Sequence, residues 1–171
     1  MPTYTLIQPA VVVGAGGATS IDFTTIPSTY TDLVIKLSAR YDQSSDNAAY
    51  IRFNSDSGSN YSYRYIFGSG STASSAAASS QIFSNMGISV ASSYTASTFS
   101  NSEIYIPNYA GSTQKSMSGD NVQENNATTA FSTLTAGLWT GTAAITSIRL
   151  LPASGNFVQH STAYLYGVSN A

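Results

Sequence analysis

Apolar and polar residues alternate with a period of two along several stretches of this chain, and this pattern limits the possible folds more than any other feature. Leu33, Ile35, Leu37, Ala39 and Tyr41 would share one face of an extended segment, with the residues between them on the opposite face. Successive side chains of a β-strand point to opposite faces. The alternation therefore predicts a half-buried strand here.

A second alternating segment is aromatic. Tyr61, Tyr63, Tyr65 and Phe67 would lie on one face of a strand, and aromatic side chains pack well on a pleated surface. We expect this face to point inward. Further strands are predicted at residues 4–7, 20–24, 49–54, 99–106, 115–123, 130–135, 145–151 and 162–168. The total is about ten strands.

Turn-forming clusters separate these segments, for example at residues 54–60, 107–112 and 153–156, where Gly, Asn and Ser suit the dihedral angles of tight turns. Residues 127–138 could form a short helix, but the β-branched threonines in this stretch favour a strand. Short strands without an intervening helical period predict an all-β fold. We expect one domain over residues 1–171, an antiparallel β-sandwich of the jelly-roll kind.

Residues 68–80 contain only Gly, Ser, Thr and Ala. Such a segment has little apolar surface to offset the entropy lost on ordering. We predict a flexible Ser/Ala/Gly loop, either a solvated linker between two strands or an arm that orders against a neighbouring subunit.

Charged residues make up 8% of the chain, and the net charge is −2. The six cations are scattered, so no basic run could neutralise a series of phosphates, and nucleic-acid binding is not expected. A surface of hydroxyls, amides and small groups offers little electrostatic repulsion, which suits dense packing in an assembly.

The chain has no Cys, so disulfides and thiolate chemistry are excluded. The first residues, Met1-Pro2-Thr3-Tyr4, carry no basic region, and the apolar stretch that follows is short and runs into glycines. We expect neither a signal peptide nor a membrane span, and therefore synthesis in the cytoplasm without export by a signal peptide.

Few groups could perform chemistry, since the chain has one His and eight acidic residues. His160 has no marked acid-base partner, and no nucleophile-elbow motif is present. The glycines at 14–17 lack the spacing of a dinucleotide site. Asp42 and Asp46 lie near amides, but a turn is favoured there over a Ca²⁺ site. We expect no enzyme activity, no cofactor and no metal.

Aromatic residues remain as a resource for binding, with twelve Tyr, seven Phe and one Trp. Tyr and Trp combine a rigid apolar ring with a polar tip, so an exposed one can stack on a sugar or anchor a protein partner. Most should be core residues. Tyr109 and Trp139 are the candidates for contact with a partner or a glycan.

Two blocks carry a family resemblance. Residues 20–27 run into 31–40 in the first block, and the second is Ile104-Tyr105-Ile106-Pro107-Asn108-Tyr109-Ala110-Gly111-Ser112, with similar segments at 124–126, 135–139, 144–150 and 162–167. Together they resemble a group of small structural proteins of tailed bacteriophages, especially those of aquatic bacteria and cyanobacteria. The similarity covers most of the chain outside residues 68–80.

The resemblance implies a non-enzymatic virion component with a β-sandwich fold, often a homotrimer. We expect a capsid decoration (cement) protein that binds the major capsid protein on the outer surface of the head, because the chain lacks the repetitive or coiled-coil stalk of a fibre. The alternative is a tail or tail-fibre domain that binds host-surface carbohydrate. A glycan-degrading tail enzyme is the third possibility, which would need paired carboxylates in a cleft.

Overall fold

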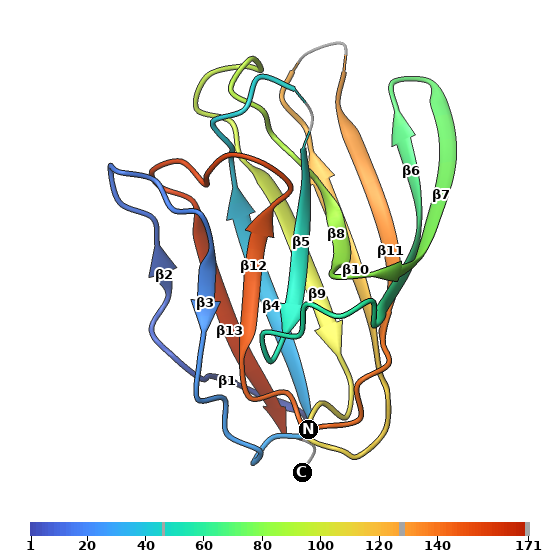
Figure 1. The fold of residues 1–171 in the computed structure, drawn as a ribbon. Coiled ribbons are helices and arrows are strands. Elements are labelled where there is room, and N and C mark those ends of the chain that lie inside the picture. Colours follow the sequence, from blue (N-terminus) through green and yellow to red (C-terminus); the bar gives the residue numbers. More distant parts are fainter. Residues whose placement is uncertain (46, 127–128, 170–171) are drawn as a thin grey trace.

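The structure is a computed structural model that describes residues 1–45, 47–126 and 129–169. These residues contain thirteen β-strands and no helix. The strands form two antiparallel sheets that face each other across one core (Figure 1). The predicted all-β antiparallel sandwich is confirmed, whereas the jelly-roll connectivity stays a prediction.

The two sheets differ in size. The larger has nine strands, in the order β1 (Thr3–Leu6), β13 (Thr162–Ser169), β4 (Asp32–Ala39), β9 (Ser100–Ile106), β10 (Lys115–Gln123), β11 (Phe131–Trp139), β6 (Tyr61–Ser69) and β7 (Thr72–Gln81), with β2 (Val11–Val12) also paired to β13. The smaller has four, in the order β3 (Ile21–Phe23), β12 (Ile148–Pro152), β5 (Asn47–Phe53) and β8 (Ser84–Ser89).

The alternation along β4 faces the core as predicted. Leu33, Ile35, Leu37 and Ala39 are buried, and Tyr41 continues the series just beyond the strand. Burying each large apolar side chain contributes about 1.5–3 kcal/mol relative to leaving it in water. The same face of β4 therefore anchors the centre of the larger sheet.

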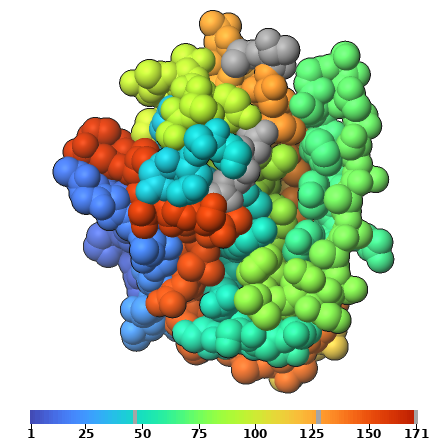
Figure 2. Space-filling view, turned by 45° about the horizontal axis from the view of Figure 1, so that its top comes forward, coloured from blue at the N-terminus to red at the C-terminus, as the bar shows by residue number. Residues whose placement is uncertain are grey.

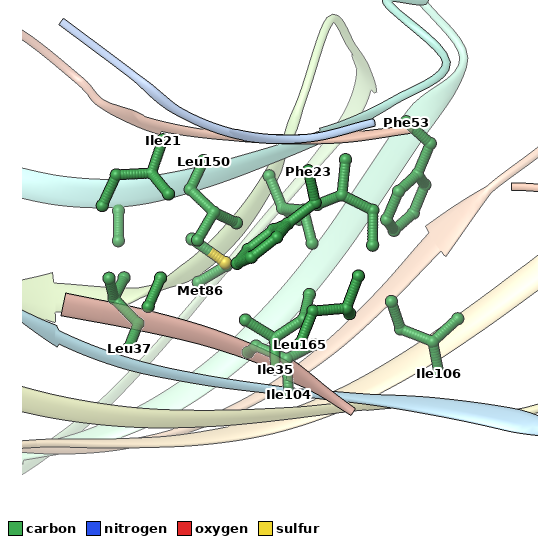
Figure 3. Close-up of a cluster of buried hydrophobic side chains, with 14 of the residues drawn as sticks. Ile21, Phe23, Ile35, Leu37, Phe53, Met86, Ile104, Ile106, Leu150 and Leu165 are labelled. Carbon is green, nitrogen blue, oxygen red and sulfur yellow. The ribbon is translucent and has the colours of Figure 1, made fainter. Parts of the chain in front are cut away.

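Side chains of the two sheets meet in the middle of the sandwich (Figure 3). Phe23, Phe53 and Leu150 come from the smaller sheet, and Ile35 and Leu165 come from the larger one. All five are fully or almost fully buried. Their interdigitation fixes the distance and orientation of the two sheets.

Two of the six cations are buried and hold loops. The guanidinium of Arg40 donates to four backbone carbonyl oxygens between residues 92 and 98, at 2.8–3.1 Å. The ammonium of Lys115 donates to the carbonyl oxygens of Gly111 at 2.7 Å, Thr113, and Thr142 at 3.4 Å. Burial lowers the pKa of both side chains. Neither charge is available to a partner.

All ten predicted strands are present, but three more were not expected: β2, β7 and β8. β2 has only two residues, which is too short for a periodic pattern. β8 contains Asn, Gly and Ser on a nearly completely buried strand, so its composition does not indicate its burial. The predicted strand at 127–138 begins at Phe131, while Ala127 and Thr128 lie outside the described residues.

The predicted loop at residues 68–80 is wrong for most of its length. Residues 72–81 form β7, which pairs along β6 after a two-residue turn at Gly70 and Ser71. Gly70 has a φ of +55°, a conformation that glycine adopts without strain. Hydrogen bonding to the adjacent strand β6 orders this segment although its side chains are small. The composition of the segment does not indicate this pairing.

We predict that Phe53→Ala lowers the free energy of unfolding by about 3–5 kcal/mol, because it leaves a cavity among buried rings. Urea denaturation followed by tryptophan fluorescence and circular dichroism would measure this. The matched control is Ile66→Ala on the exposed face of β6, which should change stability by less than about 0.5 kcal/mol. Equal losses of unfolding free energy in the two variants would contradict the burial of Phe53 in the core.

Candidate interaction surface

The larger sheet extends past the smaller one. The smaller sheet ends at β8, which packs over β9, β10, β11 and β6, and β7 lies beyond it. Strands β11, β6 and β7 form what we call the wing, and Figure 2 shows its β6–β7 hairpin as a ridge along one side of the molecule. Both faces of β7 are largely exposed. The wing therefore presents two surfaces and a free edge.

The outer face of the wing is apolar and shallowly concave. Ile66 and Leu134 are neighbours in the β6–β11 register, and each is 58% exposed. They line a hollow of about 640 Å³ together with Arg64, Ala77 and Ala136. Large apolar side chains at this exposure, gathered in one hollow, are typical of a surface that contacts another protein.

The inner face of the wing carries a row of aromatic rings. Centroid distances are 6.2 Å between Tyr63 and Tyr65, 5.7 Å between Tyr65 and Phe67, and 6.0 Å between Phe67 and Phe131. These four rings are half-buried, whereas Tyr61 at the start of β6 is buried completely. The shared aromatic face was predicted correctly, but β8 covers it only in part.

Charge is almost absent from the wing. Arg64 is the one charged residue of β6, β7 and β11, and no charged residue occurs between Arg64 and Glu103. Two other exposed cations form ion pairs, Lys36 with Glu103 at 2.8 Å and Arg149 with Asp22 at 2.5 Å. A partner that covered the wing would have to desolvate very little charge.

Tyr109 lies in the interior, with no exposed surface. Its hydroxyl donates to the carbonyl oxygen of Pro27 and accepts from the backbone N–H of Tyr30 at 3.4 Å. Burial raises the pKa of this hydroxyl. Tyr109 therefore ties the loop after β9 to the segment before β4 and offers no surface to a partner.

Trp139 is also a core residue, 4% exposed at the end of β11. Its ring packs against Phe53 and Tyr61 at centroid distances of 5.6 and 6.3 Å. Its Nε1–H donates to Oδ2 of Asp56 at 2.7 Å. Burial raises the pKa of Tyr61 to about 12. Tyr109 and Trp139 therefore expose little or no ring surface for the predicted contact with a partner or a glycan.

A second group of aromatic residues lies on the outside of the larger sheet, and we call it the tyrosine patch. Tyr4 and Tyr105 are 56% and 38% exposed, and Tyr164 and Tyr166 are half-buried. Centroids are 6.5 Å apart for Tyr4 and Tyr166 and 6.4 Å apart for Tyr164 and Tyr166. In the sheet register, Tyr105 and Tyr166 flank Val34 of β4.

The titratable side chains do not gather at one place. Within the described ranges, no group of three or more His, Cys, Asp or Glu could hold a metal ion. His160 is exposed, and Asp42 accepts from the backbone N–H and side-chain amide of Asn156 at 2.9 and 2.8 Å. Asp46 lies outside the described residues. Asp42 thus braces a turn.

A group of buried polar side chains, which we call the polar seam, lies where the wing joins the rest of the larger sheet. Gln123 and Thr133 project inward from β10 and β11, are at most 1% exposed, and have no side-chain hydrogen-bond partner among residues 1–45, 47–126 and 129–169. Within the same ranges, the buried hydroxyls of Thr135 and Ser84 also have no hydrogen-bond partner. Unpartnered buried polar groups each cost about 1–3 kcal/mol.

Sequence reasoning did not identify the wing or the tyrosine patch. The uncharged stretch after Arg64 was a usable signal for the wing, and the alternation of Tyr164 and Tyr166 was one for the patch. Neither signal says which face of a strand stays uncovered. That depends on how far the smaller sheet reaches.

Comparisons with known proteins gave no match to a family model, a curated protein or a solved structure. Nor do the described ranges include a helix long and apolar enough to cross a membrane.

We predict that stability falls as the pH drops from about 5 to about 2, because the Trp139 N–H holds the pKa of Asp56 below its usual range. A carboxyl group with a lowered folded-state pKa stabilises the fold above its unfolded pKa, and this contribution is lost as it becomes protonated. Asp56→Asn should make the pH dependence shallower in urea titrations. Asp120→Asn on the exposed face of β10 is the control. The same dependence of the free energy of unfolding on pH in the unmodified protein and in both variants would contradict this assignment.

Proposed function

We propose that this protein is a non-enzymatic structural component of a tailed-phage virion that decorates the outer surface of the head by binding the major capsid protein. The observation that carries the proposal is the wing, a partly apolar extension of a firmly packed sandwich whose strands carry Arg64 as their one charged residue. The resemblance of its strands and turns to small phage structural proteins supports the virion setting.

Binding would stabilise the shell by mass action. A ligand that binds only the assembled capsid lowers the free energy of that state relative to its separated subunits. Apolar surface such as that of Ile66 and Leu134 contributes about 25 cal/mol for each Å² removed from water. The near absence of charge keeps the desolvation cost low.

The proposed oligomer is a homotrimer, since three-fold geometry suits the local symmetry axes of a capsid. The low net charge favours close association of the copies. Multi-angle light scattering at micromolar concentration measures the mass directly. A monomer under these conditions would contradict a preformed trimer.

A tail or tail-fibre domain that binds host-surface carbohydrate is the second candidate, and the tyrosine patch favours it. Tyr4 and Tyr105 expose ring surface on which a sugar could stack. Binding to host glycans that is lost in Tyr4→Ala and Tyr105→Ala, with the fold retained, would support this alternative.

Gold-labelled antibody imaging of purified particles separates the two candidates. Label over the heads supports decoration of the capsid. Label confined to the tails contradicts it and favours glycan binding, and particles without label contradict both virion assignments.

We predict that Ile66→Asp combined with Leu134→Asp weakens binding to heads that lack the protein by at least roughly ten-fold, because each change places a charge in the apolar hollow. Co-sedimentation with such heads measures the binding. Val12→Asp is the matched control, since Val12 is 60% exposed and belongs to β2, a strand at the opposite side of the molecule from β6 and β7 (Figure 1). Equal binding by all variants would show that the hollow is not the contact.

A further inference from the structure

Strand β7 is an open sheet edge, and the bulge near Ser80 is the one interruption of its regular pairing with β6. It is ten residues long and is hydrogen-bonded to β6 on one side only. Natural edge strands are commonly short, charged, interrupted by Pro or covered. The other edges follow this rule: β1 and β3 have four and three residues, and β8 is almost entirely buried. β7 has no charge and no Pro.

The sequence of β7 is self-complementary. Residues 74–80 are Ser-Ser-Ala-Ala-Ala-Ser-Ser, which is the same in both directions about Ala77. In an antiparallel pair of identical strands centred on Ala77, Ala76 would lie opposite Ala78 and Ser75 opposite Ser79. Only Ala and Ser side chains then face each other across the axis, so no bulky or charged group keeps the two backbones apart.

We propose that the β7 edge binds a second copy of this chain, so that two β7 strands pair antiparallel about a two-fold axis at Ala77 and join two larger sheets into one. The backbone N–H and C=O groups of this edge supply the hydrogen bonds. The bulge beside Ser80, which has a φ of +55°, ends the regular edge and limits the pairing to a short segment centred on Ala77.

The single charge of the wing does not oppose this pairing. Arg64 lies opposite Ala77 in the β6–β7 register. The two Arg64 residues of the pair are separated by three strand spacings, about 14 Å. Screening in physiological salt acts over about 8 Å, so the repulsion between them is small.

The pairing also brings together the surfaces that the sandwich leaves uncovered. Tyr65 lies beside Ala76 and Tyr63 beside Ala78. On the inner face of the joined sheet, the aromatic rows of the two copies would lie on either side of the alanines of the two β7 strands. On the outer face, the hollows of the two copies would become continuous. This contact is separate from the proposed three-fold association, because a two-fold contact joins only two copies.

Single cysteine substitutions test the pairing, since the chain has no Cys of its own. In Ala77→Cys, the two thiols face each other across the axis within disulfide reach. In Ala76→Cys and Ala78→Cys, the substituted residues of the two copies do not lie opposite each other but two positions apart along the strand. Their Cα atoms are then about 8 Å apart, which is too far for a disulfide. Oxidation of the purified full chain, followed by non-reducing electrophoresis, measures the dimer formed.

We expect Ala77→Cys to form the disulfide dimer roughly ten-fold faster than either neighbour. Circular dichroism of each variant confirms that the exposed substitution leaves the fold intact. A monomer in all three variants would overturn the proposal and leave the edge to a strand of another protein. Equal rates in the three variants, or a maximum at a different position of β7, would overturn the two-fold axis at Ala77.

Sedimentation velocity of the unmodified chain gives a second measurement. Reversible self-association that increases with concentration, and that is lost in Ala77→Pro but kept in Val12→Asp, supports the edge contact. Association that Ala77→Pro leaves unchanged contradicts it. Both experiments use purified protein, so their outcome is independent of where the protein lies on a virion.

Discussion

Burial between the faces of two sheets holds this molecule together, and it reaches only as far as the smaller sheet does. Phe23, Phe53 and Leu150 cover the centre of the larger sheet, so β4 and its neighbours are enclosed. β8 covers part of β11 and β6, and beyond it the described residues form no opposing strand. The larger sheet continues past β8 to β7 because backbone hydrogen bonds extend a sheet without requiring a cover on its faces.

This mismatch in size links the fold to its proposed function. The enclosed half contains the apolar core and the loops held by Arg40 and Lys115. The open half carries the aromatic row, the outer hollow and the unprotected edge. A rigid sandwich with an extension that carries almost no charge can present surface to a partner while its stability comes from the other half. The polar seam at Gln123 and Thr133 lies between the two regions.

The alternation of residues was a reliable guide to strands with one buried face, such as β4 and β6. It did not identify β7 or β8. β7 has small side chains that show no contrast between faces, and β8 is buried by its neighbours despite polar residues. Tyr109 and Trp139 show a related limit, because an aromatic residue looks the same in sequence whether it is enclosed or exposed. Their burial depends on Pro27, Asp56 and other residues far away in the chain.

Local properties of the chain thus determine the all-β class and the position of most strands, because the period of two and the turn residues act over a few neighbours. The low charge, visible in the composition, likewise limits which partners the surface suits. The order of the strands, the pairing of β7 with β6 and the extent of the smaller sheet come from contacts between distant segments. These contacts decide which faces are covered, and so they alone separate the core aromatics from the wing that a partner could reach.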